Sequence, residues 1–144
     1  MGILRIARAP AATVAPSATV MDAAKRMKEA NVGAVAVLDR EVLKGIFSER
    51  DLMLRVVLEH RNLNETRVGD VMTTNIVAIY KDTPPEEAVT LMWERHIRHL
   101  PVVTRDGRVE GIVEIRNLFH ERFEDMNRQL DSLESYIACD GIGG

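Results

Sequence analysis

The 144-residue sequence is poor in several features, and each shortage narrows the class of protein. A single cysteine, Cys139, excludes an internal disulfide and favours a reducing, cytoplasmic setting. No apolar run approaches the roughly 18 residues of a membrane span, and none follows Arg5 and Arg8 as a secretory signal requires. The net charge of −3 leaves no basic footprint for nucleic acid. We therefore expect a cytoplasmic protein that contacts neither a membrane nor nucleic acid.

The common sequence motifs of enzymes are also missing. The sequence has no P-loop, no paired-carboxylate motif and no serine–histidine–aspartate order. His96 and His99 are spaced to share a helical face, but a zinc site needs about four ligands and the only cysteine lies far along the chain. We therefore expect neither catalysis nor a bound metal, and we interpret Cys139 as an ordinary thiol in a glycine-rich tail.

What the sequence does contain is an internal repeat. Each half has a helix-capping threonine, an amphipathic stretch, two apolar runs joined by a turn, and the start of a second helix. In order, these segments are 19–27, 34–38, 43–47 and 48–52 in the first copy, and 83–92, 100–103, 109–113 and 114–118 in the second. The offset drifts from 64 to 66 residues, which predicts insertions at Pro84-Pro85 and at the Asp106-Gly107 turn.

Local signals predict the same elements in both copies. Thr19 and Thr83 are expected to cap the first helices, with an acidic residue three positions on in each copy. Short β segments at 13–15 and 76–79 precede these helices, so each unit is β-α-β-β-α. Neither unit buries much surface alone. We expect one α/β (α+β) domain, a pseudo-two-fold sandwich of repeats at 9–59 and 70–123, with a linker at 60–69 and a helical extension with a flexible tail at 124–144.

An apolar stripe marks the C-terminal region. Its members alternate spacings of four and three residues, as in a coiled-coil seam: Phe119, Phe123, Met126, Leu130, Leu133 and Ile137. A helix over 115–138 would be roughly 36 Å long. We expect the two phenylalanines to stay within the domain. The rest of the stripe packs either against the chain's own body or against a second copy, and we favour a homodimer.

The repeat resembles a pair of cystathionine-β-synthase (CBS) domains, called a Bateman module, over residues 9–123. Four segments carry the resemblance: Gly-Ile-Phe-Ser-Glu-Arg-Asp-Leu at 45–52, Val-Met-Thr at 71–73, Ile-Arg-His-Leu-Pro-Val-Val at 97–103 and Gly-Ile-Val at 111–113. Copy one lacks the Met-Thr opening, and Ala9-Pro10 lies at about that place. The resemblance implies a regulatory module that is not an enzyme. It also implies two clefts for an adenosyl effector, such as AMP, ADP, ATP, S-adenosylmethionine or NAD, with no required cofactor.

The family pattern Gly-hydrophobic-x-Ser/Thr-x-x-Asp is intact in copy one. It implies that Ser48 faces a phosphate and that Asp51 accepts from ribose hydroxyls. Ser48 stands where a strand turns into a helix, and unpaired N–H groups at such a point suit a phosphate. The resemblance places four further residues in this cleft: Thr13, Pro16, Ile46 and Arg50. The same Ser48 and Asp51 spacing is also that of a capping box, so both interpretations stay open.

Copy two departs from the pattern at Glu114 and Asn117. A carboxylate would repel a phosphate unless a cation intervened, and an amide binds ribose without charge assistance. Arg98 and His99 occupy positions from which basic residues of nucleotide-sensing relatives reach phosphates; alternatively, they are a solvated helix end. We expect one competent site in copy one and a weaker or vacant second site near Arg98, His99, Pro101 and Asn117.

These observations favour a homodimeric sensor of an adenosyl ligand that acts on an unknown client protein. The alternative is a structural or partner-binding dimer with degenerate clefts and no ligand.

Overall fold

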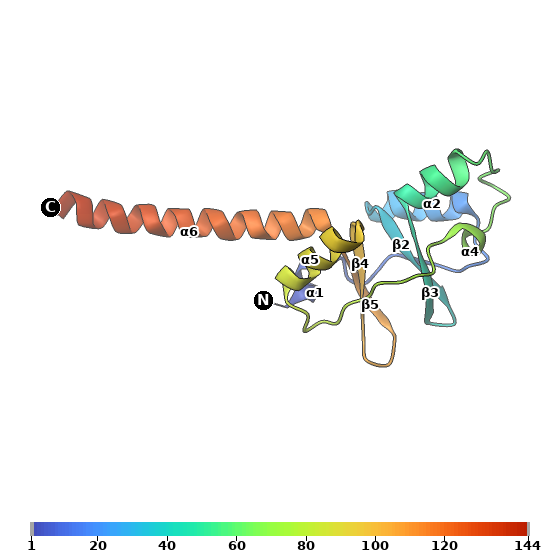
Figure 1. Cartoon of the computed structure of the whole chain (residues 1–144), viewed down its shortest axis with the longest axis horizontal. Helices are drawn as coiled ribbons and strands as arrows, with labels where there is room; N and C mark the ends of the chain where they lie inside the picture. The colour runs from blue at the N-terminus through green and yellow to red at the C-terminus, as the bar shows by residue number, and fades with distance from the viewer. Residues whose placement is uncertain (1, 144) are drawn as a thin grey trace.

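Two β-hairpins with flanking helices form the body of the molecule, and one long helix extends from it in this computed structural model (Figure 1). The structure describes residues 2–143 and the side chains of 2–137. The expectations for Cys139 and the glycine-rich tail therefore lie outside the described side chains. The elements are α1 (Ile3–Ile6), β1 (Thr13–Val14), α2 (Val20–Ala30), β2 (Ala34–Asp39), β3 (Val42–Ser48), α3 (Glu49–Asp51), the π-helical η1 (Leu52–Val57), α4 (Val68–Val71), α5 (Pro85–Arg95), β4 (His99–Val103), β5 (Val109–Glu114) and α6 (Ile115–Gly143).

Corresponding residues of the two copies keep a constant offset in residue number up to the β4–β5 turn. Helices α2 and α5 begin at Val20 and Pro85, an offset of 65, and both end on a left-handed residue, Asn31 and His96. The offset becomes 66 only after the β4–β5 turn, since Glu114 occupies the position of Ser48. The predicted insertion at Pro84-Pro85 is therefore wrong, and the one at the turn is confirmed.

The helix caps differ between the copies. Thr19 forms the expected capping box with Asp22 at the start of α2. Thr83 does not cap α5, because the N-cap residue is Pro84, and the Thr83 hydroxyl accepts from the Tyr80 N–H at 3.0 Å instead. The expected cap at Thr83 was placed one residue too early by the assumed insertion.

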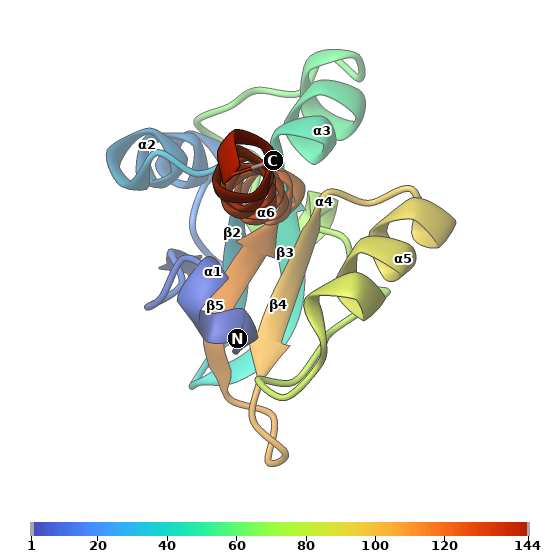
Figure 2. The same ribbon diagram turned by 90° about the vertical axis from the view of Figure 1, so that its left-hand side faces the viewer.

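The strands form two small sheets that lie against each other. Strands β1, β2 and β3 form one sheet, with β1 parallel and β3 antiparallel to β2, and β4 and β5 form an antiparallel pair. Seen along α6, the β4–β5 hairpin lies in front of the β2–β3 hairpin, with α2, α3 and α5 around them (Figure 2). The expected strand at 76–79 is reduced to a single bridge from Ile79 to Val102. The α+β sandwich is confirmed.

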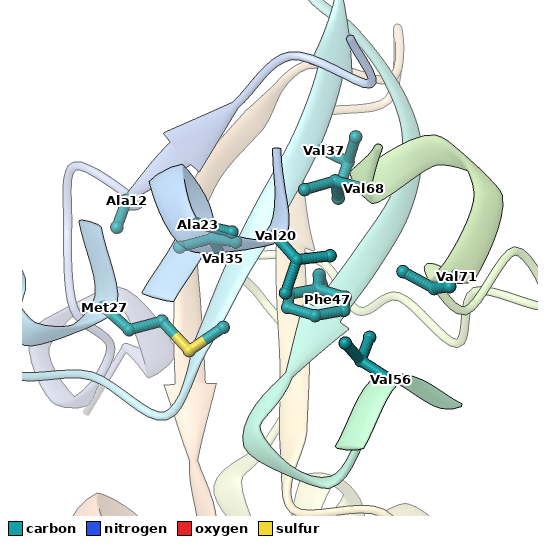
Figure 3. Close-up of a cluster of buried hydrophobic side chains, with 10 residues drawn as sticks. All are labelled: Ala12, Val20, Ala23, Met27, Val35, Val37, Phe47, Val56, Val68 and Val71. Carbon is teal, nitrogen blue, oxygen red and sulfur yellow. The ribbon is translucent and has the colours of Figure 1, made fainter. Parts of the chain in front are cut away.

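The short helix at the start of each half packs into the hydrophobic core of the other half. Ile3 and Ile6 of α1 are buried in the second core, and Arg8 pairs with Ile112 of β5. Val68 and Val71 of α4 are buried in the first core, shown in Figure 3, where they join Phe47. Thr73 pairs with Ile46 of β3 just as Arg8 pairs with Ile112. Arg8, and not Ala9-Pro10, therefore stands at the position of Thr73.

Helix α6 carries its apolar stripe away from the body (Figure 1). The six stripe residues are all more than half exposed: Phe119 57%, Phe123 61%, Met126 55%, Leu130 54%, Leu133 54% and Ile137 58%. The expectation that the phenylalanines pack within the domain is wrong. The interpretation that the stripe packs against the chain's own body is also wrong, because α6 is one unbroken helix that projects away from the body.

Gly45 lies where the segment around Thr73 crosses β3. A Cβ atom at Gly45 would come within 2.6 Å of Met72 Sδ and 2.7 Å of the Thr73 carbonyl oxygen. The carbonyl belongs to the backbone and cannot rotate away. We expect Gly45→Ala to lower the free energy of unfolding by about 1–3 kcal/mol in urea denaturation. Gly2→Ala is the control, because a Cβ there meets nothing within 4 Å. Equal free energies of unfolding for the two variants would show that the Thr73 segment does not pack this closely against Gly45.

Candidate functional site

The residues expected around the first cleft lie largely on one face of the first sheet. Thr13, Ala36 and Ile46 are aligned across β1, β2 and β3. Side chains alternate along a strand, and Val35 and Phe47 pack into the first core on the helical side. Thr13, Ile46 and Ser48 therefore point to the opposite, inner side of the sheet.

The second sheet presents the matching face. His99 is aligned with Glu114 and Pro101 with Ile112, while Leu100 and Val113 pack into the second core. The fold thus brings the strand residues of both sets, Thr13, Ile46, Ser48, His99 and Pro101, to the two inner faces of the sandwich.

Ser48 and Asp51 form a complete capping box at the start of α3. The Asp51 Oδ2 atom accepts from the Ser48 N–H at 3.0 Å and from the Ser48 hydroxyl at 3.2 Å. The Ser48 oxygen accepts in turn from the Asp51 N–H at 3.3 Å. The capping interpretation is confirmed. Asp51 is only 7% exposed, whereas Arg50 beside it is exposed.

The second oxygen of Asp51 faces another segment. Oδ1 accepts from the Thr73 hydroxyl at 3.0 Å and lies 3.7 Å from Nε of Arg55, which is half exposed. Arg55 also donates to the Val71 and Met72 carbonyls. Sequence reasoning missed Thr73 and Arg55. The Val-Met-Thr segment was visible as a motif, but its pairing with β3 is a long-range register that no local signal reports.

The N–H groups at the start of α3 are already occupied. Ser48 N–H donates to Asp51, Asp51 N–H to Ser48, and Glu49 N–H to the Gly33 carbonyl at 3.0 Å. The expectation of unpaired N–H groups facing a cleft is therefore wrong for these three positions. The cause is the capping box together with the close approach of Gly33.

Glu114 does something different from its counterpart Ser48. Its Oε1 atom accepts from the Gly33 N–H at 2.9 Å, so the side chain reaches from the second half to the first. It is 7% exposed, with His99 Nε2 at 3.6 Å and Arg116 at 3.8 Å. Burial lowers the pKa of His99 from its ordinary 6.5, although Glu114, Glu49 and Asp51 act in the opposite direction. The imidazole is thus mainly neutral at pH 7.

The remaining residues of the expected second site are not gathered like those of the first. The buried Oδ1 atom of Asn117 has no hydrogen-bond partner in the described part of the chain. Its counterpart Asp51 has Thr73, but Arg8 stands in that position here and donates to the Ala30 carbonyl instead. Arg98 is exposed. His99 lies close to the first half, since a Cβ at Gly33 would be 2.9 Å from its Nε2 atom.

Pro16 stands apart from the rest of the first group. It lines an open surface depression together with Lys44, Asp70 and Met72, and this depression does not include Ser48 or Asp51.

Among the described residues, no cluster of three or more His, Cys, Asp or Glu side chains is placed to hold a metal. None of the helices in the described chain combines the length and apolar character that crossing a membrane requires.

Comparison with known proteins identifies the family. The CBS domain model matches residues 4–58 and 68–124. The chain is 40% identical over 107 residues to the CBS domain-containing protein YhcV of Bacillus subtilis, covering 74% of this chain and 75% of that protein. It is 33% identical over 124 residues, 83% of this chain, to the mitochondrial CBS domain-containing protein CBSX3 of Arabidopsis thaliana, of which it spans 60%.

Two solved structures share the fold and contain ligands. The CBS domain pair of MJ0100, in complex with 5′-methylthioadenosine and S-adenosylmethionine, superposes with a TM-score of 0.79 at 23% identity, covering 87% of this chain and 98% of that one. The CBS domain protein PAE2072 of Pyrobaculum aerophilum, complexed with AMP, gives 0.74 at 22% identity, covering 81% and 89%. With two matches to the family model and a sandwich of two interlocked halves, this chain belongs to the CBS domain family.

Proposed function

We propose that the chain is a non-catalytic regulatory module that binds an adenosyl ligand between its two halves. The observation that carries this proposal is the Asp51 carboxylate, which is buried beside the inner face of the first sheet and held by Ser48. Asp51 and Ser48 stand at the two positions of the family's ligand pattern. The adenosyl compounds found in MJ0100 and PAE2072 support the same class of ligand here.

The geometry suggests how the ligand is held. Oδ2 of Asp51 is fixed by the capping box, whereas Oδ1 accepts from Thr73, which belongs to a separate segment. The two ribose hydroxyls would replace Thr73 as donors to Oδ1, and a charged acceptor strengthens these bonds. Thr13 and Ile46, which the resemblance places in this cleft, lie on the same sheet face and would line the ligand.

Thermal unfolding with a ligand panel tests the proposal. At a hundredfold excess over the dissociation constant, at least one of AMP, ADP, ATP, NAD, adenosine and S-adenosylmethionine should raise the melting temperature by about 5–10 °C. Guanosine at equal concentration is the control for non-specific effects. The absence of a shift with every adenosyl compound would contradict the proposed function.

The second candidate is a structural or partner-binding module with degenerate clefts. Glu114 favours it, because its carboxylate stands where Ser48 stands in the first half, and Asn117 favours it because an amide stands where the family pattern has an acid. This candidate predicts no melting shift with any adenosyl compound but the same oligomer.

The exposed stripe of α6 supports a homodimer as part of the proposal. Six large apolar side chains, each more than half exposed, are aligned along a helix that projects from the body. Contiguous apolar surface of this kind marks an interaction site, and the heptad spacing matches that of a second copy of the same helix. A client protein regulated by the dimer and a cytoplasmic setting, favoured by the single cysteine, complete the proposal.

A further inference from the structure

We infer that Glu114 makes the cleft select an adenosyl ligand whose 5′ substituent is neutral or cationic, such as a thioether or a sulfonium, over one that carries a 5′ phosphate. This inference rests on the proposed function, since it narrows the ligand class of the same site. It comes from the surroundings of Ser48, the residue that the family pattern places at the phosphate and so on the 5′ side of a ribose bound at Asp51.

The first support is that three backbone N–H groups beside Ser48 already have partners within the chain. Phosphate sites at helix starts depend on free backbone N–H groups. Here the N–H groups of Ser48, Glu49 and Asp51 donate to partners within the chain. A phosphate would have to displace these bonds, including the one that closes Gly33 onto α3. An uncharged 5′ group makes no such demand.

The second support is the charge between the two halves. The Glu114 carboxylate is almost fully buried and is fixed to the first half by its bond to Gly33. Glu49 also lies nearby, with its Oε1 atom 3.2 Å from the position of a Cβ at Gly33, but it is exposed, so its charge is more strongly screened than that of Glu114. The imidazole of His99 contributes little positive charge, because its burial favours the neutral form.

The arginines near Ser48 and Glu114 do not outweigh the negative charge of the buried Glu114 carboxylate. Arg116 lies 3.8 Å from Glu114 and its side chain is 73% exposed, while Arg55 is engaged with Asp51 and two carbonyls. Arg50 and Arg98 are exposed. Repulsion between a phosphate and a buried, fixed carboxylate is weakly screened, whereas attraction to exposed guanidinium groups is strongly screened.

Calorimetric titration of the full chain with matched ligands tests the inference. Adenosine and AMP differ only in the phosphate, and 5′-methylthioadenosine and S-adenosylmethionine supply a neutral and a cationic 5′ group. We expect AMP to bind at least about tenfold more weakly than adenosine. Glu114→Gln keeps an acceptor for the Gly33 N–H but removes the charge. This variant should tighten AMP binding about tenfold relative to adenosine binding.

The control variant is Glu41→Gln, which removes the same charge in the exposed β2–β3 turn, at the opposite end of the hairpin from Ser48. AMP binding as tightly as adenosine to the unaltered chain would overturn the inference while leaving the proposed function intact. An unchanged AMP to adenosine ratio in Glu114→Gln would overturn the role of Glu114. Binding of none of the four compounds would overturn the proposed function itself.

Discussion

Replacing Asp51 with alanine is expected to abolish the rise in melting temperature that an adenosyl ligand produces. The carboxylate is the one charged acceptor that the first half buries beside the cleft, and a ribose diol has no equivalent partner there among the described residues. Loss of hydrogen bonds to a charged group costs about 1.5–3 kcal/mol each, so two such bonds would reduce affinity by a hundredfold or more. Differential scanning fluorimetry with and without ligand measures the effect.

Asp51 also supports the fold, so this experiment needs a control for stability. Its replacement removes the acidic half of the capping box, so the Ser48 N–H loses its acceptor, and it leaves Thr73 without its acceptor. Asp22→Ala removes the acid of the second capping box in the same half, at an exposed position of α2. Asp22→Ala should lower the melting temperature but keep the full ligand-induced rise. Asp51→Asn preserves the side-chain volume and should still lose the rise.

If Asp51→Ala and Asp51→Asn kept the ligand response of the unaltered chain, the carboxylate would be a helix cap alone. The ligand, if any, would then bind elsewhere.

Replacing Leu130 and Leu133 together with glutamate is expected to turn a dimer into a monomer. Each leucine is 54% exposed in the single chain and lies in the stripe of α6. Burying a leucine contributes about 1.5–3 kcal/mol, and a dimer would bury both residues from each copy. The dissociation constant should therefore rise by at least about a hundredfold. Sedimentation velocity over a range of concentrations measures it.

The matched control adds the same charges to the other side of the helix. Ser132→Glu with Ser135→Glu changes two exposed residues that lie away from the stripe at helical spacing. This variant should remain dimeric. A monomeric unaltered chain, or a dimer that survives the leucine changes, would show that the stripe does not mediate self-association.

Much of the fold could be predicted from the sequence because its signals are local. The cap at Thr19, the apolar spacing of α2 and the two hairpins each depend on a few neighbouring residues, and the helix and hairpin pattern recurs in both halves. The exchange of α1 and α4 could not be predicted, since it depends on pairing between Arg8 and Ile112, residues far apart in the chain. The insertion wrongly predicted at Pro84-Pro85 shifted the second copy by one residue and placed its expected cap at Thr83.

The site residues also divide into those with a local sequence signal and those that only long-range pairing brings together. Ser48 and Asp51 were found because their spacing has a local meaning as a cap and a family meaning as a ligand motif. Thr73 was missed because only the tertiary register brings it to Asp51. The charge of Glu114 indicated that a phosphate would be disfavoured near it. The hydrogen bond from Gly33 to Glu114 could not be predicted, because this contact depends on how the two sheets face each other.

A crystal structure of the chain with the tightest-binding adenosyl compound tests the central claim most directly. We predict the ribose hydroxyls within hydrogen-bonding distance of the Asp51 carboxylate, on the inner side of the first sheet, with the Thr73 hydroxyl displaced from Oδ1. Density for the ligand at any other place, with the bond between Thr73 and Asp51 intact, would contradict it.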